Sequence, residues 1–144
     1  MYLNNLKKLR NEREISQKEL SEELNFNRNN YKNWELGIVM IPLEYADQLS
    51  VYYNVRLSYV LGVDKQCNNH DVKIKKMNYD KMLKTLNNFK TSRKASYDTI
   101  ATYIECAKST CYSYFKGQTR IPIDRLILLA DFFDIDLDKL CDKE

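Results

Sequence analysis

The apolar pattern of this sequence occurs twice, at an offset of 80 residues. Gly37 corresponds to Gly117, and Ile41-Pro42 corresponds to Ile121-Pro122. The same offset, without a gap, joins further pairs: Leu3 and Leu83, Leu6 and Leu86, Leu9 and Phe89, Ser16 and Ser96, Leu20 and Ile100, Leu24 and Ile104, Trp34 and Tyr114, Leu49 and Leu129, Tyr53 and Phe133, Val55 and Ile135, Leu57 and Leu137. Because internal repeats indicate repeated structural units, we predict two homologous domains, residues 1–64 and 79–144. The segment between them, residues 65–78, has four lysines and one aspartate, which is typical of an exposed linker.

Composition favours helices. Only 3 Gly and 2 Pro occur in 144 residues, and Leu, Ile and Tyr recur at three- and four-residue spacings. No run approaches the roughly 18 apolar residues of a membrane span, and "MYLNNLKKLR" is an amphipathic start rather than an export signal. We therefore predict an all-α, cytoplasmic protein with no membrane partner. The formal net charge of +3 is too small to identify a polyanionic partner by itself.

Local signals divide the first domain into five helices. Leu3, Leu6 and Leu9 form one apolar face of a first helix. "SQKE", from Ser16, is a capping-box pattern that begins a second helix, which we expect to reach about Leu24. Asn27 is expected to cap a third helix, from Arg28 to about Leu36, and Gly37 to end it. Pro42 opens a fourth helix, and "LSYVLG" forms a short fifth one.

The two helices from Gln17 to Gly37 carry a recognisable spacing. Numbered from Gln17, apolar residues stand at the fourth, eighth, tenth, fifteenth and eighteenth positions, and the small residue Ser21 stands fifth. The run "SQKELSEELNFNRNNYKNWELG…IP" resembles the phage repressor and Cro-like (XRE-type) helix-turn-helix family, and the pattern recurs as "SYDTIATYIECAKSTCYSYFKGQTRIP". The resemblance implies an all-α fold of two tandem five-helix, lambda repressor-like helix-turn-helix domains. It further implies a repressor of transcription whose partner is double-stranded DNA, with the third helix in the major groove.

Helical spacing predicts the DNA-facing side of that third helix. If Tyr31 and Trp34 face the core, the opposite side carries Arg28, Asn29, Lys32 and Asn33. Arginine can bond guanine and asparagine can bond adenine through two hydrogen bonds, so these residues suit base recognition. By resemblance, Gln17 contacts a phosphate and buttresses the third helix, and Arg10 and Glu35 form a partly buried salt bridge. The alternative is that the asparagines reflect only the Asn-rich composition of the chain.

The second domain departs from the pattern. By alignment its DNA-facing residues are Lys108, Ser109, Tyr112 and Ser113, which carry fewer base-discriminating groups. The residues that replace those of the first domain are Tyr97 for Gln17, Glu105 for Asn25, Ala107 for Asn27, and Lys90 and Phe115 for Arg10 and Glu35. We predict a weaker DNA contact, supported by Lys108, Lys116 and Arg120, or a role in assembly.

The loop after the third helix is apolar. The family usually has polar or basic residues there, whereas this chain has Ile38, Val39 and Met40. We expect these side chains to pack against the second domain or a second copy in a homodimer, or to fold onto their own core. A protein-interaction module of this fold, antitoxin-like or anti-repressor, with weak or no DNA binding, is therefore the alternative function.

Enzymatic and metal chemistry lack support. The chain has one histidine and no glycine-rich phosphate loop, so we predict no enzyme, no catalytic residues, no cofactor and no small-molecule ligand. Cys67 and His70 have a zinc-like spacing without a second pair nearby, so we interpret them as linker residues. Cys67, Cys106, Cys111 and Cys141 have no close paired spacing and are expected as free thiols.

Overall fold

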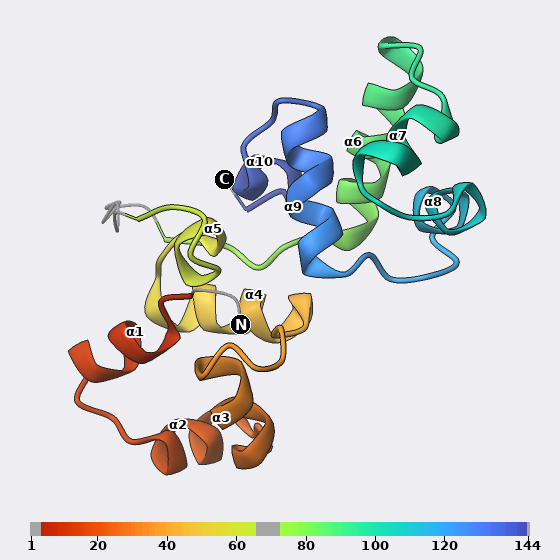
Figure 1. The fold of residues 1–144 in the computed structure, drawn as a ribbon. Coiled ribbons are helices and arrows are strands. Elements are labelled where there is room, and N and C mark those ends of the chain that lie inside the picture. The colour runs from red at the N-terminus through yellow and green to blue at the C-terminus, as the bar shows by residue number, and fades with distance from the viewer. Residues whose placement is uncertain (1–3, 66–72, 144) are drawn as a thin grey trace. The chain divides into compact units, whose positions relative to one another are not determined.

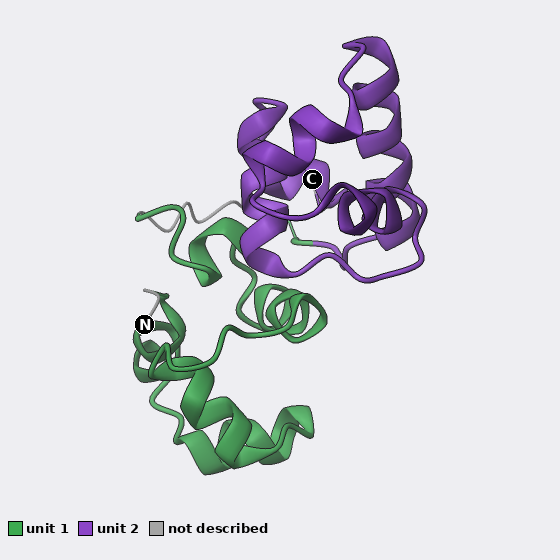
Figure 2. Ribbon diagram, turned by 45° about the vertical axis from the view of Figure 1, so that its right-hand side comes forward, with its two compact units in different colours: residues 1–74 green, residues 75–144 purple. Residues whose placement is uncertain are grey.

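The computed structural model describes residues 4–65 and 73–143 and divides the chain into two compact units, residues 1–74 and 75–144 (Figure 2). Ten α-helices lie in the described part of the chain, five in each unit (Figure 1). The predicted fold class, all-α with two tandem five-helix domains, is confirmed. None of the helices in the described ranges is long and apolar enough to cross a membrane.

The first unit contains five short helices: α1 (Leu6–Glu12), α2 (Gln17–Leu24), α3 (Arg28–Glu35), α4 (Leu43–Tyr53) and α5 (Leu57–Val60). The predicted capping box is present, because Glu19 N–H donates to Ser16 Oγ at 3.0 Å and Ser16 N–H donates to Glu19 Oε1 at 3.4 Å. Asn27 caps α3 by accepting from Asn30 N–H at 3.0 Å. Leu3, part of the predicted first apolar face, lies outside the described residues.

Aromatic rings link α3 to α4 in the core of the first unit. Tyr31 and Trp34 are 0% and 5% exposed. The Trp34 ring stacks on Tyr45 with centroids 5.1 Å apart, and Phe26 meets Tyr45 edge to face at 5.3 Å. Such pairs add to the free energy gained by burying apolar area. They fix which side of α3 faces inward.

The second unit repeats this order: α6 (Tyr79–Ser92), α7 (Tyr97–Tyr103), α8 (Lys108–Phe115), α9 (Ile123–Phe132) and α10 (Leu137–Leu140). Its first helix has 14 residues against 7 in α1, and Asn78 Oδ1 caps it by accepting from Lys81 N–H at 3.1 Å. The core follows the repeated apolar pattern. Its fully buried members include Leu86, Ile100, Leu129 and Phe133, which correspond to Leu6, Leu20, Leu49 and Tyr53.

The end of the predicted linker is not a simple exposed connector. Residues 66–72 lie outside the described residues, but Ile74 is only 5% exposed and its N–H donates to Asn54 Oδ1 at 2.7 Å. Asn54 ends α4 in the left-handed conformation (φ 54°) and offers this side-chain oxygen. In the second unit, Lys143 Nζ donates to the Lys75 carbonyl at 2.9 Å. The expectation of exposure is therefore wrong at Ile74.

Candidate nucleic-acid interface

The corner between α2 and α3 is built by a left-handed turn and a cap. Asn25 has φ 58°, a conformation that asparagine tolerates better than most residues. Phe26 then enters the core and Asn27 caps α3. Ser21, 4% exposed, is the small buried residue of α2, and α2 and α3 pack against each other.

The outer side of α3 is polar, as the spacing predicts. Tyr31 and Trp34 are buried, so α3 leaves its other side to solvent. Of the four predicted base-contacting residues, three are exposed and one is partly exposed: Arg28, Asn29 and Lys32, then Asn33. The arrangement places two cations and two amides on one accessible helical face. Their role in DNA binding remains a prediction.

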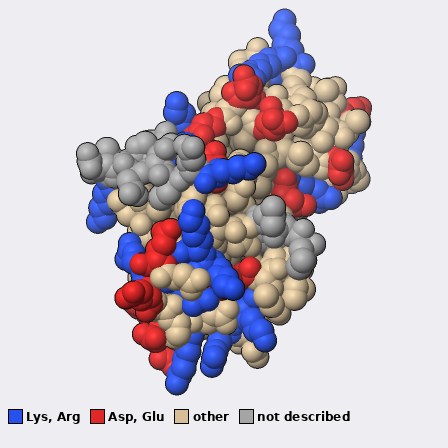
Figure 3. Space-filling view, turned by 60° about the vertical axis from the view of Figure 1, so that its left-hand side comes forward, with Lys and Arg blue, Asp and Glu red and all other residues tan. Residues whose placement is uncertain are grey.

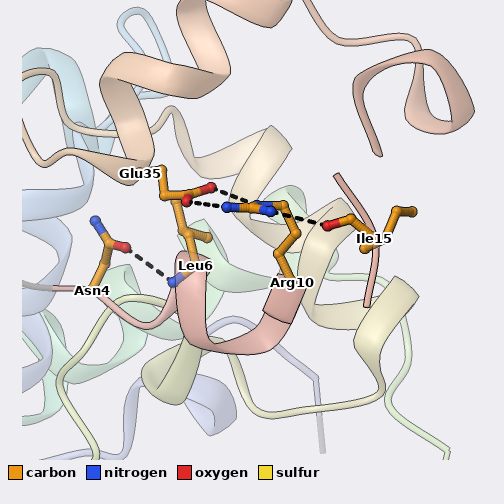
Figure 4. A network of polar contacts seen from close by, with 5 residues as sticks. All are labelled: Asn4, Leu6, Arg10, Ile15 and Glu35. Carbon is orange, nitrogen blue, oxygen red and sulfur yellow. Dashed lines mark hydrogen bonds and ion pairs between the residues drawn. The ribbon is translucent and has the colours of Figure 1, made fainter. Parts of the chain in front are cut away.

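An ion pair holds the C-terminal end of α3 against α1 (Figure 4). Arg10 donates through Nη2 to Glu35 Oε1 at 2.8 Å and through Nε to Oε2 at 3.0 Å, so the contact is bidentate. Arg10 Nη1 also donates to the Ile15 carbonyl at 3.0 Å. The two side chains are only 13% and 4% exposed. The predicted partly buried salt bridge is confirmed.

The surroundings of Glu35 favour its charged form. Burial alone would raise the pKa of this carboxyl, but the hydrogen bonds and positive charge of Arg10 outweigh burial and lower it. The side chains of Tyr31 and Gln17, next to the carboxylate, act in the same direction. Gln17, the first residue of α2, is partly exposed and its side chain contacts the Glu35 carboxylate. This position agrees with the buttressing half of its predicted role; contact with a phosphate remains a prediction.

A second polar contact on α3, and a nearby cation, were missed by the sequence reasoning. Asn4 Nδ2 donates to the Trp34 carbonyl at 2.9 Å and so ties the end of α3 to the chain before α1. Lys18, the second residue of α2, is exposed. Figure 3 shows lysine and arginine side chains protruding from the first unit, in the lower part of the view, beside a group of acidic side chains.

The equivalent corner of the second unit is strained and uncapped. Glu105 has φ 61°, which a side chain of this kind rarely adopts. Ala107 precedes α8 and provides no side-chain cap. The replacement of Asn25 by Glu105 and of Asn27 by Ala107 therefore leaves this corner with a strained turn and without a side-chain cap. Cys111 is buried, and this burial, together with the nearby Cys106, raises the pKa of its thiol to about 11. Cys106 is only partly buried.

The predicted DNA-facing residues of α8 are accessible but engaged with neighbours. Lys108, Ser109 and Tyr112 are exposed, and Ser113 is partly exposed. Lys108 Nζ lies 3.4 Å from Asp98 Oδ2, and Ser113 Oγ lies 3.5 Å from Gln118 Oε1. Lys116 Nζ lies 5.4 Å from the centre of the Tyr112 ring. The residues share a face, as predicted, but Lys108 and Ser113 have polar partners within the unit.

Aromatic contacts replace the Arg10–Glu35 pair in the second unit. The Tyr97 ring meets Tyr112 at 5.4 Å and Phe115 at 5.9 Å, both edge to face. Lys90 Nζ lies 4.0 Å from the centre of the Tyr97 ring, a cation–π distance. Tyr97 therefore joins α7 to α8 and does not offer the amide that Gln17 offers in the first unit.

The apolar loop after α3 is on the surface of the first unit. Leu36, Ile38 and Val39 are 51%, 63% and 48% exposed. The N–H groups of Ile38 and Val39 both turn back to the Asn33 carbonyl, at 3.1 and 3.4 Å, and Gly37 makes the turn with φ 74°. The alternative in which these two side chains fold onto their own core is therefore wrong. Packing against another surface remains a prediction.

Metal-binding chemistry has no cluster in the described residues. No group of three or more His, Cys, Asp or Glu side chains there could hold a metal ion. The Cys67 and His70 pair lies outside the described residues. Cys106, Cys111 and Cys141 are free thiols.

Each unit thus combines a two-helix corner, an outward-facing second helix of that corner and three supporting helices, which defines a helix-turn-helix domain. A family model described as helix-turn-helix matches residues 6–60 and again residues 91–140. The chain belongs to the XRE-type helix-turn-helix family and contains two tandem copies of its domain. No curated protein and no solved structure matches the chain. Family membership supports a DNA-binding regulator.

Proposed function

We propose that this protein is a sequence-specific, DNA-binding repressor of transcription that acts in the cytoplasm without enzymatic activity. The observation that supports this most is the division of α3 into a buried aromatic side, Tyr31 and Trp34, and an accessible side of amides and cations. In a helix-turn-helix protein that accessible side enters the major groove. Repression follows from occupancy, because a protein held at an operator blocks polymerase.

The chemistry of α3 suits base recognition. Arg28 and Asn29 stand in the first turn, the part of a recognition helix that reaches base edges. Arginine pairs with the O6 and N7 of guanine and asparagine with the N6 and N7 of adenine. Lys32 and Asn33 continue the same face one turn later. Gln17 and the first amides of α2 contact a phosphate, which fixes the register of α3 on the duplex.

The second unit contributes contacts that discriminate less between bases. The matching positions on α8 hold Lys108, Ser109, Tyr112 and Ser113. Apart from the charged lysine, the groups that could hydrogen-bond a base edge there are three hydroxyls. Lys116 and Arg120 are exposed beyond the end of α8. Contacts of this type add affinity that is independent of sequence.

Selection of preferred sites from a random duplex pool tests the proposal. We expect one enriched site, a footprint over it, and an affinity whose logarithm falls linearly with the logarithm of salt, by roughly 0.9 per phosphate contact. A pool that shows no enrichment after repeated rounds would contradict sequence-specific binding. Footprint length reports whether one unit or two contact the DNA, since half-sites lie about 34 Å apart when two such units bind one face.

One observation favours a second candidate, a protein-interaction module of antitoxin-like or anti-repressor type. Leu36, Ile38 and Val39 expose apolar area at a position where the family usually contacts phosphate. Contiguous apolar surface of this kind marks interaction sites. This candidate predicts weak or salt-independent affinity for duplex DNA, so the salt titration separates the two functions.

A further inference from the structure

The helix before the recognition helix carries opposite charges at one position in the two units. Lys18 is the second residue of α2, and Asp98 is the second residue of α7, 80 residues later. Both are exposed. The starts of α2 and α7, and the bounds of α3 and α8, differ by the same offset, so the two positions are structurally equivalent.

Asp98 lies beside the first residue of α8. Its Oδ2 is 3.4 Å from Lys108 Nζ, and the two side chains are 72% and 63% exposed. A pair this exposed adds little stability. The Asp98 carboxylate can nevertheless offset the charge of Lys108 without a fixed geometry. The two groups stay closer together than roughly 8 Å, the distance over which physiological salt screens charges. The cation at the start of α8 is therefore neutralised, whereas Lys18 and Arg28 at the equivalent positions are both positive.

The neighbouring residue changes in the same direction. In the first unit Gln17 offers an amide at the start of α2, next to Lys18. In the second unit Tyr97 turns its ring toward Tyr112 and Phe115 instead. The proposed function places a DNA phosphate at the start of α2. At the equivalent place the second unit has the ring of Tyr97 instead of an amide and the carboxylate of Asp98 instead of a cation.

We infer that Asp98 restrains the second unit from gripping the DNA backbone, so that the first unit selects the site. The inference rests on the proposed function, since it concerns which unit engages the duplex. A phosphate that approaches Lys108 meets the Asp98 carboxylate at the same time. Repulsion between the two anions lowers the affinity of this corner for any duplex, whatever its sequence. Lys116 and Arg120, farther along the chain, remain as the weaker contacts.

The test changes the charge at position 98 in the full chain. We expect Asp98→Lys to raise affinity for a random duplex, with a salt dependence steeper by one phosphate contact. The ratio of variant to parent affinity should then grow about 3.5-fold as salt falls from roughly 0.2 M to 0.05 M. Asp98→Asn should give a smaller gain in the same direction, and it keeps the side-chain shape if the lysine variant folds poorly.

Asp80→Lys is the matched control. Asp80 is also exposed and also stands in the first turn of a helix, α6, so both variants remove an acidic residue from a helix start and change the net charge equally. Equal gains at positions 80 and 98 would show a general charge effect and overturn the inference. An absence of any gain at position 98, with both Asp98 variants folded, would overturn it as well.

The reciprocal change separates this inference from the proposed function. Lys18→Asp places the same carboxylate beside Arg28 and should weaken binding to the selected site and to random duplex. If the parent enriches no site, the proposed function fails, while the random-duplex comparison of Asp98→Lys with Asp80→Lys still decides the inference. If the parent enriches a site and the position-98 variants behave as the parent does, only the inference fails.

Discussion

The two helix-turn-helix corners share their apolar framework but hold their recognition helices by different chemistry. In the first unit a bidentate ion pair between Arg10 and Glu35 secures α3. In the second, the cation of Lys90 over the Tyr97 ring and the packing of that ring on Phe115 secure α8. The same backbone arrangement can therefore be held by an ion pair or by aromatic contacts. The apolar repeat specifies the fold, while the polar residues on it can change separately.

Some polar contacts are kept in both units. Arg13 and Arg93, which are equivalent, donate to the equivalent carbonyls of Tyr53 and Phe133. Others are rebuilt from new positions. Asn4 donates to the Trp34 carbonyl near the end of α3, and Asn87, which is not equivalent to Asn4, donates to the Phe115 carbonyl at the end of α8. Carbonyls in the last turn of a helix have no partner one turn further along the helix. Each unit supplies an amide donor from its own first-helix region, although the Trp34 carbonyl also accepts from Gly37 N–H at 3.0 Å.

The largest difference between the units should appear when the first-helix cation is removed. Arg10→Met keeps the apolar stem but leaves Glu35 buried and unpaired, and we expect the first unit to lose about 3 kcal/mol of stability. Lys90→Met in the second unit removes only a cation–π contact, worth less than about 1 kcal/mol. Denaturant unfolding followed by Trp34, the only tryptophan, reports on the first unit. Hydrogen exchange reports on the second, and similar losses in both units would contradict the comparison.

Acid should weaken the first unit through the same ion pair. The folded state lowers the pKa of Glu35 below its ordinary value of about 4.3. The stabilising contribution is therefore present above the unfolded pKa and is lost as pH falls through the folded pKa. Denaturant midpoints from Trp34 fluorescence should fall over that range. In Glu35→Gln this part of the pH dependence should disappear, and a midpoint that falls equally in this variant would assign the effect to other carboxyls.

Base recognition should also distinguish the units. Arg28→Ala and Asn29→Ala should each remove about 1 to 3 kcal/mol from binding to the selected site, with little change in folding, because both side chains are exposed. Lys108→Ala and Ser109→Ala should cost less, and by the same amount on every duplex. Competition between the selected site and scrambled duplexes measures both quantities. Equal losses on all sequences for the α3 variants would contradict base contacts by α3.

The difference in helix caps should change the free energy of unfolding of each unit by about 1 kcal/mol. Ala107 leaves the first amides of α8 without a side-chain partner, whereas Asn27 Oδ1 accepts from Asn30 N–H. We expect Ala107→Asn to stabilise the second unit, and Asn27→Ala to destabilise the first, each by about 1 kcal/mol. Thermal unfolding by circular dichroism, with Trp34 fluorescence for the first unit, measures the two shifts. Ala107→Ser provides a second capping variant, and no stabilisation by either would contradict the prediction, because Ala107 already has the extended backbone of an N-cap, as Asn27 does.

The sequence could predict those features that depend on residues close together in the chain. Ser16, Asn25 and Asn27 act on backbone groups within five residues, so the corner of the first unit could be predicted from them. The buried side of α3 follows from helical periodicity. The prediction was wrong at Ile74 because this residue is held by a hydrogen bond to Asn54, 20 residues away, which no local signal indicates.

The polar partners of the second unit were also beyond local signals. Lys108 is a plausible DNA contact in the sequence, but its neighbour Asp98 lies on the preceding helix and meets it only after the corner forms. Lys90 and Tyr97 likewise meet only when α6 and α7 are in place. The Arg10–Glu35 pair was found because the family resemblance supplied it. Composition and spacing alone give no reason to join those two residues.

The smallest effect on folding is expected at the apolar loop, where the units also differ. Ile38 is 63% exposed and Gln118 is its exposed polar equivalent. Since burial contributes little at either position, Ile38→Asp and the control Gln118→Asp should both change the free energy of unfolding by less than about 0.5 kcal/mol. Association is the more informative measurement. If Leu36, Ile38 and Val39 contact a second copy, sedimentation velocity should show that Ile38→Asp weakens self-association while Gln118→Asp does not. A change in neither folding nor association for Ile38→Asp would remove the loop from the proposed assembly, because an apolar side chain that can become a carboxylate without effect is not part of a buried contact.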